Sequence, residues 1–140
     1  MTDELEKERI ILKKNEAKAE QMIQILRKNF GGKIFPEFER CAQYDPDFFE
    51  WFNQIRPRCF VDGKMLPAKY RALIHMCLLA YRGEVKGVKE RIRMAIGLGA
   101  TKLEIVEAFE TAMVAGGVPT LLNGMAGLIQ YEESQSKQEK

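Results

Sequence analysis

Four side chains near the middle of the sequence could bind and transform a small anion: Arg71, His75, Glu84 and Arg91. Arg71 and His75 are four residues apart, so they lie on one face of a helix. Glu84 and Arg91 are seven apart and share a face of the next predicted helix if it begins by Glu84. If these faces meet in a cleft, the two arginines can bind an organic carboxylate while His75 or Glu84 transfers a proton. The alternative is a set of surface salt bridges and one hydrogen-bonded histidine.

The cysteines and the single histidine limit this chemistry. Cys41, Cys59 and Cys77 are odd in number and widely spaced, and no two form a CxxC pair. This pattern favours neither a disulfide framework nor a zinc site, and reduced thiols are typical of the cytoplasm. One histidine excludes any mechanism that needs two imidazoles from one chain. No nucleotide-binding loop or metal cluster is visible, so we expect no cofactor and no metal.

Composition indicates one globular domain of ordinary type. The 140 residues are 46% hydrophobic and 30% charged. A formal net charge of +2 is low for the concentrated basic face of a nucleic-acid-binding protein. No apolar run approaches the roughly 18 residues that span a bilayer, and the charged stretch from Met1 to Lys14 lacks the apolar core of a signal peptide. We therefore expect a cytoplasmic protein with no nucleic-acid or membrane partner.

Helices must position the candidate residues, because no segment alternates apolar and polar residues as a strand does. The predicted fold class is all-α. Residues 1–30 predict a long N-terminal helix that packs on another surface or frays at its start. Residues 31–131 predict a second domain, in which the last four helices span 68–81, 85–98, 102–115 and 120–131. Residues 132–140 predict a disordered polar tail.

Several apolar surfaces in these helices need partners. The helix over 68–81 has a predicted inward side formed by Leu73, Ile74, Cys77, Leu78 and Ala80. The aromatic segment 48–55 favours a core or subunit-interface anchor over a ligand-binding box. The small residues Gly124, Ala126 and Gly127 permit close helix packing, either within the subunit or across a dimer.

The most informative local pattern is a turn between two predicted helices. Gly99 can end the first helix because glycine adopts a positive φ without a Cβ clash. Thr101 can cap the next helix, and Glu104, three residues later, completes a capping box. A second glycine break follows at 116–117, with Pro119 close behind.

This order of residues resembles the carboxymuconolactone decarboxylase family, which includes the alkylhydroperoxidase D-like proteins. The family pattern H-x-x-x-A-x-x-x-G-x-T-x-x-E-I falls, with arginine in place of histidine, on Arg91, Ala95, Gly99, Thr101, Glu104 and Ile105. The segment 66–74 and the later Ala112, Ala115, Gly116 and Pro119 also resemble the family. The resemblance covers about 64–128 and implies an alkylhydroperoxidase D-like helical domain behind a long N-terminal helix.

The resemblance implies one of two chemistries. The peroxidase branch uses E-x11-C-x-x-C-x-x-x-H, in which a thiolate reduces peroxide. Those four positions hold Ala72, Glu84, Gly87 and Arg91, so CxxC peroxidase chemistry is not expected. In the decarboxylase branch the enolate-like anion needs a positive partner, which Arg91 supplies. Arg91 is too weak an acid to donate a proton at neutral pH, so His75 or Glu84 must do so.

Three functions stay open at this point. The first is a decarboxylase-like lyase or a binder of a small organic anion, with Arg71 and Arg91 as ligands of the carboxylate. The second is a thiol-dependent peroxidase-like oxidoreductase, and the third is a non-catalytic oligomeric interaction protein. Family relatives usually form trimers or hexamers, so the resemblance implies a homo-oligomer of this kind.

Overall fold

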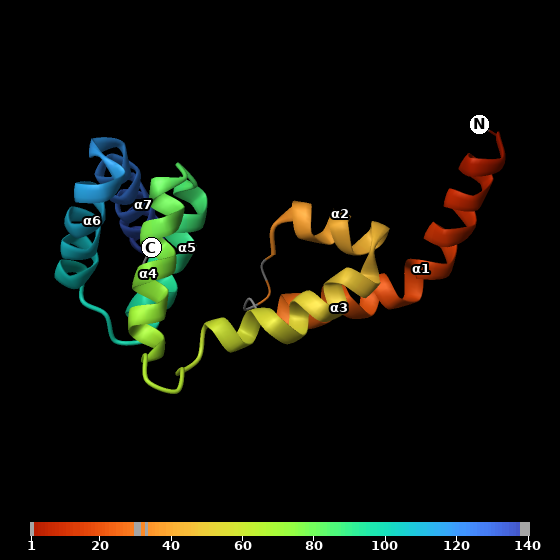
Figure 1. Cartoon of the computed structure of the whole chain (residues 1–140), viewed down its shortest axis with the longest axis horizontal. Helices are drawn as coiled ribbons and strands as arrows, with labels where there is room; N and C mark the ends of the chain where they lie inside the picture. The colour runs from red at the N-terminus through yellow and green to blue at the C-terminus, as the bar shows by residue number, and fades with distance from the viewer. Residues whose placement is uncertain (1, 30–31, 33, 138–140) are drawn as a thin grey trace. The chain divides into compact units, whose positions relative to one another are not determined.

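The computed structural model describes residues 2–29, 32 and 34–137, and all regular structure in these ranges is helical. The predicted all-α fold is confirmed. The chain divides into two compact units, 1–59 and 60–140 (Figure 1). The sequence predicted a boundary after residue 30 instead. The long first helix does not stand apart, because its second half shares a core with the two helices that follow it.

The first unit contains α1 (Thr2–Asn29), α2 (Pro36–Tyr44), α3 (Pro46–Ile55) and a short 3-10 helix, η1 (Arg56–Cys59). Its core consists of Met22, Ile23, Leu26, Ala42 and Phe49. The first half of α1 is helical but exposed, including its apolar side chains Leu5, Ile10 and Ile11. The aromatic segment 48–55 is also only partly buried: Phe49 belongs to the core, while Phe48 and Trp51 are exposed.

The second unit contains α4 (Ala68–Tyr81), α5 (Val85–Gly97), α6 (Lys102–Gly116) and α7 (Val118–Ser136). The prediction of a disordered tail is wrong for 132–136, which continue α7. Side-chain contacts accompany this last part of α7: Glu132 pairs with Lys102 at 2.7 Å, Ser134 Oγ donates to the Tyr131 carbonyl oxygen at 2.6 Å, and Ser136 Oγ donates to the Glu132 carbonyl oxygen at 3.2 Å. The end of the predicted tail, 138–140, lies outside the described residues. No helix in the described ranges combines the length and apolar character needed to cross a bilayer.

Local sequence signals set the turn between α5 and α6. Gly99 has a φ of 87°, as its position in the turn predicted. The Thr101 side chain accepts a hydrogen bond from Glu104 N, and the Glu104 carboxylate accepts one from Thr101 N, which completes the predicted capping box. Glu104 also pairs with Lys69 at 2.8 Å. The start of α6 is therefore tied to the start of α4.

The small residues of α7 permit close packing inside this unit. A Cβ atom added at Gly124 would lie 2.5 Å from the Phe109 ring of α6, and one added at Gly127 would lie 2.4 Å from Val88 of α5. Real Cβ atoms do not approach other atoms this closely. Packing within the subunit, one of the two predicted uses of these small residues, is therefore confirmed for Gly124 and Gly127.

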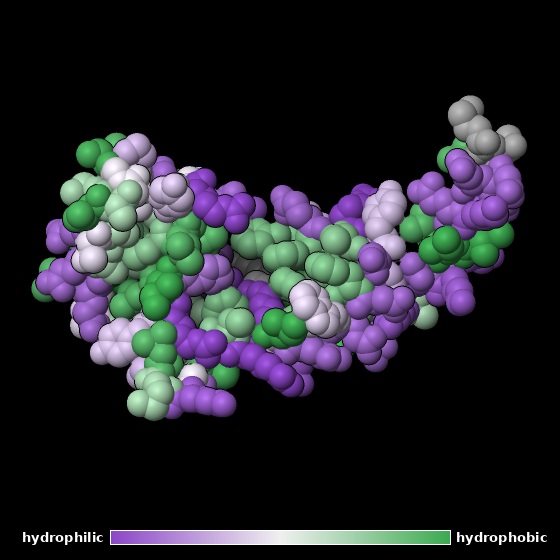
Figure 2. All heavy atoms as spheres, viewed as in Figure 1, coloured by the Kyte–Doolittle hydropathy of each residue, from purple (hydrophilic) through white to green (hydrophobic). Residues whose placement is uncertain are grey.

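The apolar side predicted for α4 is only partly its core side: Ala80 is buried, and Leu73 and Cys77 pack against the core. The core side of this helix is formed by Ala72, Met76 and Ala80, whereas Ile74 and Leu78 are exposed. α4 is apolar around most of its circumference, so its sequence pattern could not identify the core side. Its exposed positions are all large and apolar: Tyr70, Ile74, Leu78 and Tyr81. Figure 2 shows apolar side chains gathered over this helix.

Candidate functional site

Arg91 is a cation in the interior of the second unit. It lies in the middle of α5, between the core residues Val88 and Ile92, and the residue is only 7% exposed. Burial lowers the pKa of its guanidinium, and the nearby Glu90 opposes this effect. Burying a charge without an opposite charge is costly, so a side chain in this position needs an explanation.

The polar contacts of Arg91 are few. Its Nη1 donates to the Sδ of Met94 at 3.5 Å, a weak acceptor. Its Nε is buried and has no hydrogen-bond partner among the described residues. Glu90, the adjacent acid, pairs with Arg93 at 2.8 Å instead. Arg91 thus keeps an unused donor, and none of the described carboxylates forms an ion pair with it.

A phenylalanine connects Arg91 with His75. The guanidinium carbon of Arg91 lies 4.6 Å from the centroid of the Phe60 ring, a cation–π contact. The same ring is stacked on the His75 imidazole, with centroids 5.3 Å apart and an interplanar angle of 20°. The structure therefore brings two of the predicted site residues to one aromatic side chain. Sequence reasoning missed Phe60, because no local spacing relates it to residues on two later helices.

Arg71 contacts the backbone next to Phe60. Its Nη1 donates to the carbonyl oxygen of Val61 at 2.7 Å. Val61 follows Phe60 directly, so Arg71 holds the backbone beside the ring that covers Arg91. The described contacts connect Arg71 with Arg91 indirectly through this segment, and the binding of one ligand by both arginines stays a prediction.

Glu84 is not brought to the other candidates by any contact that the described residues form. It is exposed at the N-cap of α5, and its backbone N–H donates to the Leu79 carbonyl oxygen at 2.9 Å. Two helical turns separate it from Arg91, a rise of about 10 Å along the axis. The predicted shared face required a helix that begins by Glu84, but α5 begins at Val85 and Glu84 is its N-cap residue, so the two side chains do not share a helix face.

The cysteines do not form a reactive thiol pair. Cys77 is half-buried and packs against the core, its Sγ donates to the Ala108 carbonyl oxygen at 3.4 Å, and burial raises the pKa of its thiol. Cys41 and Cys59 are exposed in the first unit. A raised pKa favours the protonated thiol, which is the unreactive form. Within the described residues, no three His, Cys, Asp or Glu side chains are placed to hold a metal ion.

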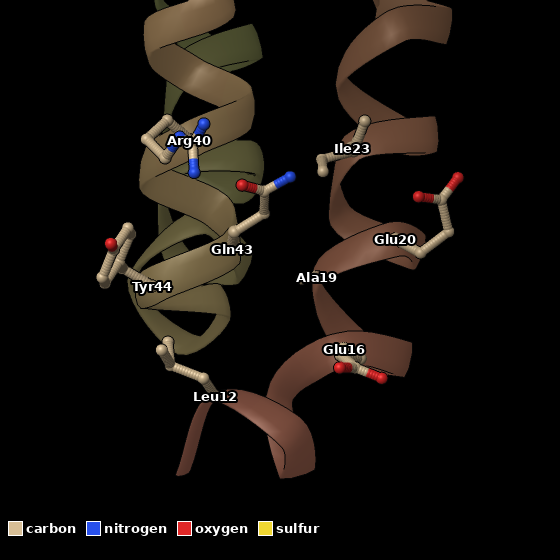
Figure 3. Close-up of a pocket in the computed structure, with 8 residues that line it drawn as sticks. All are labelled: Leu12, Glu16, Ala19, Glu20, Ile23, Arg40, Gln43 and Tyr44. Atoms are coloured by element: carbon tan, nitrogen blue, oxygen red, sulfur yellow. The ribbon is translucent and has the colours of Figure 1, made fainter. Parts of the chain in front are cut away.

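A groove of about 440 Å³ lies in the first unit, between α1 and α2. Ala19 and Ile23 are its buried residues, and Gln43 and Ile23 point toward each other across it (Figure 3). Its charged residues, Glu16, Glu20 and Arg40, are exposed and solvated. None of the predicted site residues lines this groove, so it is separate from the candidate site around Arg91.

Comparison with known proteins assigns the chain to a family. A model of the carboxymuconolactone decarboxylase family matches residues 46–129, more than half of the chain. An uncharacterised protein of Methanocaldococcus jannaschii is 24% identical over 90 residues, which cover 64% of this chain and 83% of that protein.

A solved structure shows the same fold. The crystal structure of a candidate carboxymuconolactone decarboxylase from Burkholderia xenovorans LB400 matches with a TM-score of 0.65 at 22% identity. The match covers 94% of this chain and 98% of that one. The capped turn at Gly99–Thr101, the helical fold and the family model agree, and the chain belongs to the carboxymuconolactone decarboxylase family.

Proposed function

We propose that this protein binds a small organic carboxylate at Arg91 and acts as a decarboxylase-like lyase in the cytoplasm. The observation that carries the proposal is the buried Arg91 guanidinium, whose Nε has no acceptor among the described residues. A carboxylate would supply both the missing acceptor and the missing opposite charge. Arginine suits this task because its planar donors match the two oxygens of a carboxylate.

The proposed reaction uses two groups in different roles. The bond between the carboxylate carbon and its neighbour breaks, carbon dioxide leaves, and the electron pair stays behind as an enolate-like anion. The positive charge of Arg91 stabilises this anion. Protonated His75 then donates a proton to the carbanionic carbon and regains one from water. His75 is favoured over Glu84 because it shares the Phe60 ring with Arg91.

A calorimetric titration tests the binding step. Small carboxylates, including carboxymuconolactone, are titrated into the full chain, into Arg91→Met and into Arg93→Met. Arg93 is the matched control, because it is two residues away in the same helix and pairs with Glu90 at the surface. We expect Arg91→Met to weaken binding at least about tenfold and Arg93→Met to leave it unchanged. Equal binding by all three proteins would refute the proposal.

The lyase step has its own measurement. Release of carbon dioxide from carboxymuconolactone should fall about 100-fold in His75→Gln, while the affinity for the substrate changes little. If the unmodified protein binds the substrate but releases no carbon dioxide, the lyase activity is excluded and the protein is an anion-binding protein.

A thiol-dependent peroxidase is the second candidate, and the thiols disfavour it. The CxxC positions hold Glu84 and Gly87, and the thiol of Cys77 has a raised pKa. Peroxide consumption with a thiol reductant is the test. Peroxide turnover that survives the replacement of all three cysteines would exclude a thiol-dependent mechanism.

The third candidate is a homo-oligomeric interaction protein, and the exposed apolar positions of α4 support self-association. None of the exposed positions of this helix is charged. They are Tyr70, Ile74, Leu78 and Tyr81. Such a surface is typical of a protein–protein interface. We propose that copies of the chain assemble through it into a trimer or a hexamer, an arrangement compatible with either binding or catalysis.

A further inference from the structure

The first half of α1 has an apolar side that its own unit leaves exposed. This part of the helix extends past α2 and α3 (Figure 1), and Leu5 on it is 55% exposed. Leu5, Leu12 and Ala19 are spaced by seven residues, so they lie on one face of the helix. Ala19 is buried and Leu12 is half-buried. The face that packs inside the unit therefore continues for about two turns into solvent.

The groove between α1 and α2 begins where this exposed face ends. Ala19 and Ile23 are its buried apolar residues. Its two sides carry opposite charges, with Glu16 and Glu20 on α1 and Arg40 on α2 (Figure 3). None of these three side chains forms an ion pair with another described residue. The groove is thus an apolar surface between an acidic side and a basic side whose charges are unpaired.

The exposed face of α1 carries charges that complement the groove. At about 100° per residue, Arg9 lies about 40° to one side of Leu5, and Glu8 lies about 60° to the other side. Arg9 approaches Glu6 only to 3.9 Å, and both of these side chains are exposed, so this pair contributes little. Leu5 therefore has a base on one flank and an acid on the other.

We infer that this groove binds the first half of α1 from a second copy of the chain, in a two-fold exchange. A right-handed helix that lies in the groove antiparallel to α1 turns its Arg9 flank toward α1 and its Glu8 flank toward α2. Only this direction brings Arg9 to Glu16 and Glu20, and it also brings Glu8 to the Arg40 side. A parallel helix would bring like charges together. Antiparallel is the direction that a two-fold axis imposes on two copies of one helix when the axis is perpendicular to it.

The spacing along α1 lets both copies make this contact at once. When Arg9 of one copy lies midway between Glu16 and Glu20 of the other, Leu5 lies about 6 Å further along the groove, close to the level of Ile23. The apolar side chain thus reaches the apolar part of the groove in the same register that pairs the charges. Two identical antiparallel helices have the same register in both directions, so the second copy receives the same contacts.

A contact of this kind joins copies in pairs. Combined with a three-fold assembly through α4, a two-fold contact at α1 produces a hexamer. The inference rests on the proposed assembly through α4 only for this number, because the exchange at α1 pairs two copies with or without it.

Light scattering of the full chain tests the apolar contact. Leu5→Lys places a charge in the groove, and Ile10→Lys is the matched control, because Ile10 is also exposed and lies about 140° around the helix from Leu5. We expect a hexamer for the unmodified protein and for Ile10→Lys, and half that mass for Leu5→Lys. Both changes are at exposed positions, so circular dichroism should show unchanged helix content.

Charge reversal tests the direction of the exchange. Arg9→Glu and Glu20→Arg each place like charges together, so each should weaken the pairing at least about tenfold in sedimentation experiments. The two changes combined in one chain should restore most of it. Lys14→Glu is the control, because it makes the same change of charge on the far side of α1 and should leave the pairing unchanged.

The outcomes separate this inference from the other proposals. A trimeric or monomeric unmodified protein, an unchanged mass for Leu5→Lys, or a double variant that pairs no better than Arg9→Glu would overturn the exchange. An unmodified dimer that Leu5→Lys converts into a monomer would support the exchange and contradict the assembly through α4. None of these variants changes Arg91, so the carboxylate titration tests the proposed function independently.

Discussion

At the scale of single residues, the buried charge of Arg91 opposes stability, and the proposed function gives that charge a use. A guanidinium that is 7% exposed and has no carboxylate partner among the described residues lowers stability, because its charge loses hydration without full compensation. The contact with Phe60 offsets part of this loss of hydration free energy, since a desolvated cation–π contact contributes about 2 kcal/mol. Residues that lower stability in this way are expected at binding sites rather than in a purely structural core.

Removing this charge should therefore stabilise the free protein. We expect Arg91→Met to raise the free energy of unfolding by about 1–3 kcal/mol, because methionine fills similar volume without a buried charge. Urea denaturation measures the change, and Arg93→Met, a surface substitution, should stay within about 0.5 kcal/mol of the unmodified protein. A less stable Arg91→Met would mean that the guanidinium is a structural group.

At the scale of elements, the capping box at the start of α6 couples stability to pH. Hydrogen bonds from Lys69 and from the Thr101 backbone lower the pKa of Glu104 below its ordinary 4.5. A carboxyl with a lowered pKa in the folded state stabilises the protein above its ordinary pKa. That stabilisation is lost as the pH falls through the lowered value.

The expected result is a pH-dependent difference between the unmodified protein and Glu104→Gln. The unmodified protein should melt at the higher temperature near about pH 7, and the gap should close on acidification from about pH 4.5 downward. Thermal unfolding followed by circular dichroism measures it. Glu107→Gln, an exposed change on the same helix, is the control, and a gap that is constant with pH would contradict the assignment.

Close packing between α6 and α7 gives a second test at this scale. Gly124→Ala would place a methyl group 2.5 Å from the Phe109 ring, so we expect it to lower the free energy of unfolding by about 2 kcal/mol or more. Gly97→Ala is the matched control, because nothing lies within 4 Å of its added Cβ. That change should be neutral or stabilise by up to about 1 kcal/mol. Chemical denaturation of both variants would show the contrast, and equal effects would refute it.

At the scale of the whole molecule, the exposed apolar positions of α4 form a surface that the second unit leaves uncovered. Two of them, Ile74 and Leu78, belong to the side that the sequence predicted to face the core. A helix that is apolar all round is normally buried all round. A second copy of the chain would cover the side that the second unit leaves exposed.

We expect light scattering to give a trimer or a hexamer at micromolar concentration. Leu78→Lys should dissociate it toward the 16.1 kDa monomer, because a charge in the centre of an apolar interface is costly to desolvate. Ile10→Lys, an equivalent change at an exposed position of α1, should leave the assembly intact. A monomeric unmodified protein would contradict the proposed assembly.

The sequence by itself determined the helical class, the ends of the central helices and the absence of a cysteine pair. α4 begins and ends where it was predicted, and the turn at Gly99–Thr101 has the predicted φ and capping box. These features depend on residues within one or two helical turns of one another, so the local chain carries all the information.

Only the tertiary structure decided where the candidate residues lie and what they contact. Arg91 contacts Phe60, and Arg71 holds Val61, so segments that are distant along the chain meet here. The burial of Arg91 results from the same packing. The core side of α4 was likewise undetermined, because a helix with apolar residues on nearly every side has no periodic signal to read. Contacts of this kind depend on how whole helices pack, and that packing is a property of the folded unit rather than of any local pattern.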